Sequence, residues 1–112
     1  ENDWKQMENS LGGGYETAKK IMTPTRWLYN QDLNATNESG FTALPEGRRT
    51  WGGSFTGYNE TANWWTSTET NSGNSVSIGL NGYNLLGGGK LNYGESTDKE
   101  TGLSVRCFRE NN

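Results

Sequence analysis

The chain is short, glycine-rich and acidic. It has 112 residues, of which 16 are glycine and none is histidine, and its net charge is −3. This length suits one domain, and the acidic balance argues against a protein that binds nucleic-acid phosphates. No apolar run approaches the roughly 18 residues of a membrane span. Without histidine, the chain can form neither a Ser-His-Asp or Cys-His nucleophile pair nor a histidine-ligated zinc site.

Two short helices are predicted at the N-terminal end. Asp3 and Gln6 have the spacing of a capping pair that opens the first helix, and the glycines at 12–14 would end it. A second helix is expected over residues 16–21, because Pro24 prevents a longer one. The apolar face of the first helix would carry Trp4, Met7 and Leu11.

From residue 27 onward, short apolar stretches alternate with glycine, asparagine and serine, which is typical of short strands and loops. Residues 75–80 alternate strictly and place Val76, Ile78 and Leu80 on one face of a strand. The stretch NGYN at 81–84 indicates a turn, and residues 48–60 read as an irregular glycine-rich loop. The predicted fold class is therefore α+β, with the helices first and a small antiparallel sheet after them.

The last stretch, GLSVRCFRE at 102–110, also alternates. One face would carry Leu103, Val105 and Cys107, and the other Ser104, Arg106 and Phe108. Cys107 is the single cysteine, so the chain has no internal disulfide. Because its neighbours at i−2 and i−4 are apolar, we expect Cys107 to be a small buried hydrophobic residue in a closing strand.

Trp64 and Trp65 are adjacent in a predicted strand, so their side chains must point to opposite faces. Buried aromatics dominate cores that are poor in aliphatic residues, which favours a structural role for both. One ring would enter the core, and the other would pack under the glycine-rich loop at 48–57. The alternative is that one ring is exposed as a platform for a sugar or a peptide.

Several separated stretches resemble one known family. They are LGGGYETAKKIM at 11–22, TNESGFTALPEGRR at 36–49, GSFTGYNETANWWTSTET at 53–70 and GLSVRCFRE at 102–110. Their order and content resemble the Fibrobacter succinogenes major paralogous domain, in which a Gly-Phe-x-Ala-Leu-Pro-x-Gly-x-Arg segment precedes a Trp-Trp segment and a Gly-x-Ser-Val-Arg-Cys ending. The likeness runs from Trp4 to Arg109.

The resemblance implies a C-type lectin-like fold, in which two short N-terminal helices pack on a small, irregular antiparallel sheet and the termini lie close together. It also implies display on a bacterial cell surface, often as the last domain of a lipoprotein or larger adhesin. We therefore expect residues 1–112 to form a single extracellular domain cut from, or C-terminal in, a longer exported protein. The family carries no established chemistry. A pair of active-site cysteines, as in formylglycine-generating enzymes with a similar ending, is absent.

Residues 71–98 are rich in Asn, Ser, Gly and Tyr, a composition typical of adaptable recognition surfaces. Tyrosine offers contact area and asparagine offers hydrogen bonds to hydroxyls or amides. The alternative is that these residues only form hairpin turns and solvent-facing strand positions. The predicted binding residues, with two aromatics added from the glycine-rich loop, are Asn81, Tyr83, Asn84, Asn92, Tyr93, Trp51 and Tyr58.

Other polar groups carry weaker hypotheses. Four acidic residues could supply oxygen ligands for calcium, but the sugar-binding tripeptides of calcium-dependent lectins are absent and an ordinary solvated loop is favoured. No metal or cofactor is expected. No motif marks a carboxylate pair for glycoside hydrolysis, and Arg48 and Arg49 are expected to pair with a carboxylate or pack over a tryptophan. The four acidic residues are Glu69, Glu95, Asp98 and Glu100.

Taken together, the sequence favours a non-enzymatic binding or adhesion module, monomeric and not membrane-spanning, that recognises a carbohydrate or a surface protein. Two alternatives stay open beside it. One is a structural cap or spacer of a surface lipoprotein that has no ligand. The other is a variable binding domain diversified by a retroelement. A carbohydrate hydrolase would need two carboxylates that converge in a pocket, and fold alone does not choose among these functions.

Overall fold

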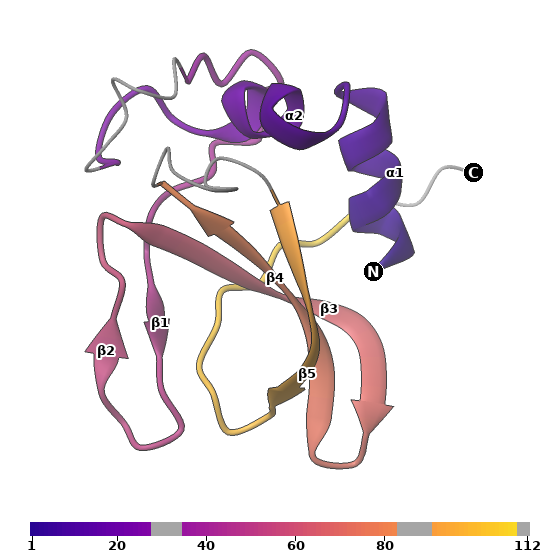
Figure 1. Ribbon diagram of the computed structural model, residues 1–112, viewed down its shortest axis with the longest axis vertical. Helices are drawn as coiled ribbons and strands as arrows, with labels where there is room; N and C mark the ends of the chain where they lie inside the picture. The colour runs from indigo at the N-terminus through magenta and orange to yellow at the C-terminus, as the bar shows by residue number, and fades with distance from the viewer. Residues whose placement is uncertain (28–34, 83–90, 110–112) are drawn as a thin grey trace.

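Helices come first and strands follow, as Figure 1 shows for the computed structural model, which describes residues 1–27, 35–82 and 91–109. The protein is α+β, as predicted. In chain order the elements are α1 (Asn2–Ser10), α2 (Gly14–Ile21), β1 (Arg48–Arg49), β2 (Phe55–Thr56), β3 (Thr61–Asn71), β4 (Asn74–Asn81) and β5 (Leu91–Asp98).

The first helix begins earlier than its sequence pattern predicts. Its N-cap is Glu1, which makes no side-chain capping bond, so the predicted capping role of Asp3 is wrong. Asp3 instead lies in the first turn, where a carboxylate interacts favourably with the helix dipole. The two helices are tied together by Thr17, whose buried hydroxyl donates a hydrogen bond of 2.8 Å to the Glu8 carbonyl.

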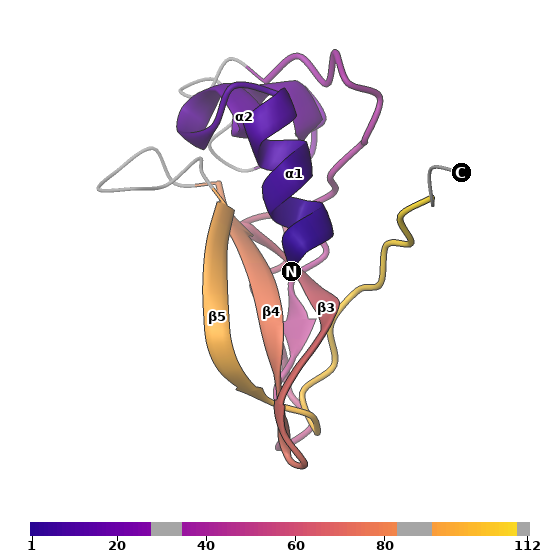
Figure 2. The ribbon, with the colours of Figure 1, turned by 90° about the vertical axis from the view of Figure 1, so that its right-hand side faces the viewer.

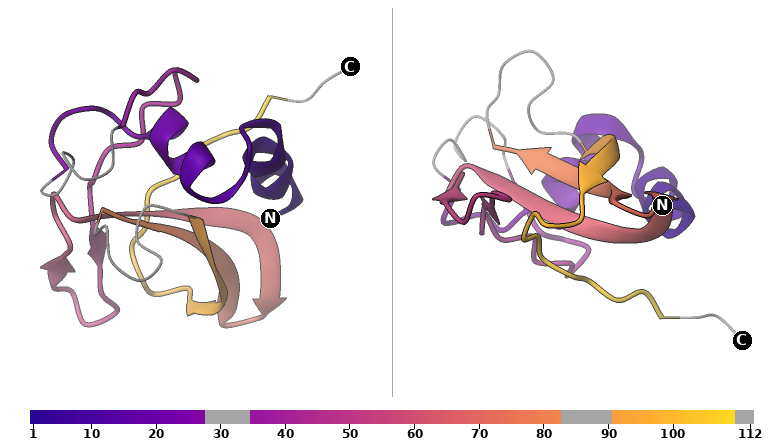
Figure 3. Two further views of the ribbon diagram at one scale, coloured as in Figure 1. Left: turned by 45° about the horizontal axis from the view of Figure 1, so that its top comes forward. Right: turned by 90° about the horizontal axis from the view of Figure 1, so that it is seen from below.

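The main sheet has three antiparallel strands in the order β3-β4-β5. Its central strand buries Val76, Ile78 and Leu80, which are at most 3% exposed, and this confirms the predicted alternation. Figures 2 and 3 show that both helices lie on one side of this sheet. Within the described residues, no helix is long and apolar enough to cross a bilayer.

Four aromatic rings join the helices to the sheet. Trp4 of α1 lies 5.2 Å from Trp64 of β3 between ring centroids, and Phe41 lies 5.8 Å from each of them. Phe108 packs edge-on against Trp4, also at 5.2 Å. Trp4 and Phe108, from near the two ends of the chain, are therefore in contact, with Phe108 packed against the core. Aromatic contacts of this kind compensate for the shortage of aliphatic residues.

The C-terminal segment, residues 103–109, does not bury Val105 and Cys107 as predicted, and Phe108 of the opposite face packs against the core instead. Phe108 turns inward, whereas Arg106 is exposed and covers Phe41: its guanidinium lies 3.9 Å from the Phe41 ring centroid and donates to the Phe41 carbonyl. Val105 is 69% exposed and Cys107 is also exposed, so the expectation of a buried Cys107 is wrong. The aromatic cluster accepts the large Phe108 ring, and a shift by one residue exchanges the two faces of an extended segment.

The tryptophan pair is divided between two environments. Trp64 is 3% exposed and lies in the core, as expected for one of the two rings. Trp65 is half-buried and lines a pocket of about 200 Å³ together with Arg106, Cys107 and Phe108. None of the residues of the glycine-rich loop lines that pocket. The second ring therefore lies beside the C-terminal segment, and its packing under the loop stays a prediction.

Candidate binding surface

Residues 48–56, expected to be an irregular loop, form a β-hairpin. Arg48 pairs with Thr56, and Arg49 pairs with Phe55. A tight turn joins the two strands: the Thr50 amide donates to the Ser54 carbonyl over 2.7 Å, and the Gly53 amide donates to the Thr50 carbonyl over 2.9 Å. Gly53 has a φ of +96°, a left-handed conformation that favours glycine. The hairpin projects from the end of the molecule opposite the helices (Figure 1).

Two glycines fix the base of the hairpin on the main sheet. Gly47 has a φ of +70°, and a side chain there would clash with the carbonyl oxygen of Thr56. Gly57 has a φ of +79°, and a side chain there would clash with the Thr61 hydroxyl. The Gly47 amide also donates to the Thr61 carbonyl over 2.8 Å. Because the backbones approach so closely, the hairpin has a defined position relative to β3.

Three large aromatic side chains on or beside the hairpin are exposed to solvent. Trp51 in the turn is 71% exposed, Phe55 on β2 is 82% exposed, and Tyr58 just after β2 is 61% exposed. Neighbouring Arg48 and Arg49 are exposed as well. Single exposed apolar residues are common, but several aromatics on one element are typical of an interaction site. We call these five residues, together with the groove described below, the hairpin surface.

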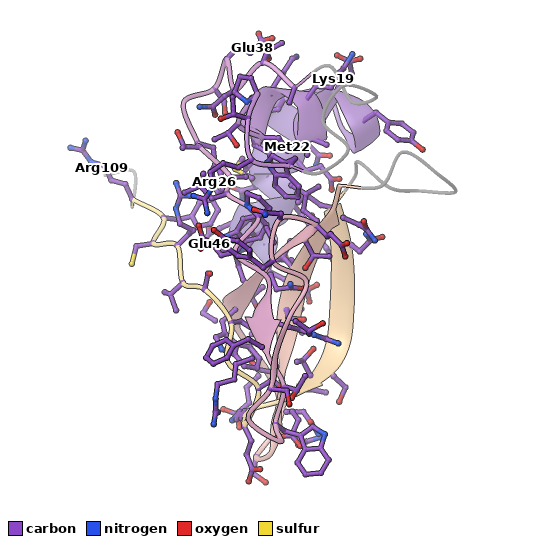
Figure 4. All side chains as sticks on the ribbon, turned by 90° about the vertical axis from the view of Figure 1, so that its left-hand side faces the viewer. Lys19, Met22, Arg26, Glu38, Glu46 and Arg109 are labelled. Carbon is purple, nitrogen blue, oxygen red and sulfur yellow. The ribbon has the colours of Figure 1, made fainter. Side chains whose placement is uncertain are left out.

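A polar cluster holds Tyr58 in place. Arg26 donates a hydrogen bond of 3.2 Å to the Tyr58 hydroxyl and lies 3.2 Å from a carboxylate oxygen of Glu46. Its guanidinium carbon lies 5.8 Å from the centroid of the Tyr58 ring. The hydrogen bond to Tyr58, and to a lesser degree the Glu46 carboxylate, raise the pKa of Arg26. Figure 4 shows Arg26 and Glu46 side by side. The exposed Tyr58 ring is therefore positioned before any ligand arrives.

A shallow groove of about 280 Å³ lies between β1 and the start of the C-terminal segment. The two segments are paired there, because Arg49 and Gly102 exchange backbone hydrogen bonds of 2.9 and 2.8 Å. A Cβ atom at Gly102 would lie 3.0 Å from the Arg49 Cβ, so this approach is tight. The groove is lined by Glu46, Gly47, Arg48, Arg49, Phe55, Gly102, Leu103 and Ser104.

The structure divides the predicted binding residues among several places. Trp51 and Tyr58 belong to the hairpin surface. Asn81 pairs with Thr61, and Asn92 pairs with Gly79, so both asparagines lie on the sheet face opposite the buried strand residues. The last two predicted residues, Tyr83 and Asn84, lie outside the described residues.

Tyr93 lies on the helix side of the sheet, away from Asn92. It pairs with buried Ile78, and its hydroxyl donates a hydrogen bond of 2.9 Å to the Glu8 carboxylate. The Lys5 ammonium lies 5.3 Å from the ring centroid. Burial and the hydrogen bond to Glu8 raise the pKa of Tyr93 well above its usual value. The partly buried ring is thus engaged with α1, and it does not share a face with the predicted asparagines.

The sequence interpretation missed Phe55 and both arginines as members of this surface. The expected carboxylate partner of Arg48 or Arg49 is not found among the described residues, and neither is a ring contact with a tryptophan. The signal was present in the stretch RRTWGGSFT at 48–56, where two short extended pieces flank a turn with two glycines. Glycine content led to the interpretation as an irregular loop.

The acidic residues considered for calcium do not form a cluster among the described side chains. Within the described part of the chain, no group of three acidic or cysteine side chains is close enough to hold a metal ion. Glu69 forms an ion pair of 3.3 Å with Lys99, and the Asp98 carboxylate accepts a hydrogen bond of 2.8 Å from the Glu100 amide. Nothing is described of the Glu95 side chain.

The fold and the hairpin surface together define an α+β domain that carries exposed aromatic and cationic side chains on a β-hairpin. The model of one protein family, described as the Fibrobacter succinogenes major domain, matches residues 1–109. The chain therefore belongs to this family, as its motifs predicted. No curated protein and no solved structure gave a significant match.

Proposed function

We propose that this domain is a non-enzymatic binding module that works on the outer surface of a bacterium, where its ligand is a carbohydrate or another surface molecule. One observation carries the proposal: Trp51, Phe55 and Tyr58 are 71%, 82% and 61% exposed on or beside a hairpin whose backbone is fixed by glycine contacts. Exposed rings on a rigid element offer contact area at a small cost in conformational entropy.

The proposal includes a C-type lectin-like architecture. Two helices beside an antiparallel sheet, and chain ends that meet through Trp4 and Phe108, agree with that architecture. The proposed binding surface differs from the one expected for residues 71–98, because three exposed aromatic side chains lie on or beside the hairpin and Tyr93 is engaged by Glu8. A site on the hairpin needs neither a metal ion nor a catalytic carboxylate, since rings, guanidinium groups and backbone supply its contacts.

A structural cap or spacer without a ligand is the second candidate. It expects Tyr83 and Tyr93 to be buried or scattered singly: Tyr93 is partly buried and hydrogen-bonded to Glu8, and Tyr83 lies outside the described residues. This hypothesis gives no reason for the exposure of Trp51 and Phe55. The two candidates therefore differ in what the hairpin does, and a binding experiment separates them.

The test is a glycan-array and host-matrix screen of the 112-residue chain, run with calcium and again with chelator. The variant Trp51→Ala/Phe55→Ala removes two rings of the hairpin surface, and Tyr15→Ala, a 48% exposed aromatic on α2, is the matched control. We expect binding in both buffers, retained by Tyr15→Ala and reduced at least tenfold by the hairpin variant, or about 1.4 kcal/mol. Absence of any ligand, or equal binding by all three proteins, would favour the cap.

A further inference from the structure

We infer that the hairpin surface binds a linear polysaccharide rich in uronic acids, with Arg48 and Arg49 pairing with the sugar carboxylates and the aromatic rings stacking on the sugar faces. The inference rests on the proposed binding function and specifies its ligand. The hairpin carries two exposed arginines that lack an ion-pair partner among the described residues, a property that they share with Arg109 at the C-terminal end.

Most cationic side chains of the domain are already engaged. Four of them have a carboxylate within 3.0–3.3 Å, and two more donate to backbone carbonyls. Arg48 and Arg49 have neither kind of partner among the described residues, although the chain as a whole is acidic. The engaged residues are Lys5, Lys19, Arg26, Lys99, Lys20 and Arg106.

The two guanidinium groups are available to an anion. Both arginines line the groove, and the third charged residue there, Glu46, is neutralised by its ion pair with Arg26. The Arg49 side chain runs along the hairpin, because its Nη2 atom lies 3.2 Å from where a Gly53 Cβ would be. A planar guanidinium binds a carboxylate through two parallel hydrogen bonds, so carboxylate is the group that this site recognises.

The arrangement suits a polymer better than a single small acid. Arg48 and Arg49 are adjacent on β1, so their side chains leave the strand in opposite directions, although both residues line the groove. A chain with a carboxylate on each repeating unit can offer a separate carboxylate to each arginine. The groove is shallow and open at the surface, as a linear chain that passes across it requires.

The aromatic residues favour sugar over acidic peptide. Trp51 in the turn and Phe55 on β2 are more than two-thirds exposed, and Phe55 pairs with Arg49 across the hairpin. Flat exposed rings offer stacking faces for the apolar faces of pyranose rings, and the neighbouring cation meets the carboxylate of the same unit. An acidic peptide would use the charges but would leave these rings largely unpaired.

The experiment measures binding of polygalacturonate to the 112-residue chain by affinity electrophoresis and calorimetry. The comparison polymer is the same material after reduction of its carboxyl groups, and polyglutamate is the acidic peptide probe. The variants are Arg48→Gln, Arg49→Gln and Trp51→Ala. The charge-matched control is Arg109→Gln, because Figure 4 shows Arg109 projecting from the C-terminal segment away from the body of the domain.

We expect polygalacturonate to bind, the reduced polymer to bind at least tenfold more weakly, and each hairpin variant to raise Kd by about tenfold. Arg109→Gln should bind as the parent does. Equal binding of the reduced polymer, an equal loss in Arg109→Gln, or failure of polygalacturonate to bind would overturn the inference. So would polyglutamate binding of equal strength with the same arginine dependence, which would assign the surface to an acidic protein. If Trp51 still governs binding in the glycan screen, the proposed function stands while this inference fails.

Discussion

Replacement of Phe108 tests the unexpected orientation of the C-terminal segment. The ring is partly buried and packs edge-on against Trp4 with centroids 5.2 Å apart. Replacing a fully buried phenylalanine by alanine lowers the free energy of unfolding by about 3–5 kcal/mol. Loss of an aromatic pair adds about 0.5–1.5 kcal/mol. For a ring that is only partly covered, we expect Phe108→Ala to lower the free energy of unfolding by about 2 kcal/mol.

The assay is thermal and urea unfolding of Phe108→Ala beside Cys107→Ser and Val105→Ser. A chain of this length loses about 4 °C in Tm per kcal/mol, so Phe108→Ala should melt about 8 °C lower. The two control variants change exposed side chains and should stay within about 0.5 kcal/mol of the parent protein. A large loss in Cys107→Ser together with little change in Phe108→Ala would refute the reasoning, because it would place the other face of the segment in the core.

Three further predictions address the hairpin, the core and the pH dependence of stability. Gly47→Ala should lower the free energy of unfolding, measured with urea, by about 2–4 kcal/mol. Gly40 is also left-handed but lies in open space, so Gly40→Ala should lower it by only about 1–2 kcal/mol. Equal losses would contradict a close backbone approach at Gly47. Trp64→Ala should lower the free energy of unfolding by about 3–5 kcal/mol, and Trp65→Ala by clearly less, because only Trp64 is fully buried. A larger loss in Trp65→Ala would contradict the placement of Trp64 in the core. Because the pKa of Tyr93 is raised on folding, the folded protein keeps the phenol proton at pH values where the unfolded chain has lost it. The contribution of Tyr93 to the free energy of unfolding is therefore complete below about pH 10 and declines at higher pH. The stability difference between the parent protein and Tyr93→Phe should therefore shrink from pH 8 to pH 11 in denaturant titrations, and a constant difference would rule out this coupling.

The spacing of apolar residues and the positions of glycines between elements predicted much of the fold. The alternation of Val76, Ile78 and Leu80 identified the central strand, and the glycines after Leu11 separated the helices correctly. These patterns are reliable because they depend on the backbone period alone. The order of the predicted elements, with helices before strands, indicated the α+β class.

The errors arose where tertiary packing chose between two locally equivalent arrangements. An alternating segment has two faces, and its own pattern favoured burial of Val105 and Cys107, but the aromatic cluster around Trp4 accepts Phe108 instead. The sequence cannot show this cluster in advance, because its members come from distant parts of the chain.

The binding residues were harder to predict than the elements. Composition pointed to Asn and Tyr in residues 71–98, yet cross-strand register puts Tyr93 and Asn92 on opposite faces of the sheet. The exposure of Trp51 and Phe55 depends on a hairpin whose base is set by close contacts at Gly47 and Gly57. Such contacts between segments leave no periodic signal in the sequence.

The most direct test of the hairpin surface is amide chemical-shift mapping of the ¹⁵N-labelled domain titrated with galacturonate oligomers. We expect the largest shifts in residues 46–58 and 102–104 and at the Trp51 indole N–H, with saturation that is lost in Arg49→Gln. Shifts centred on Asn81 and Asn92, or no saturable shift in the hairpin, would contradict the account.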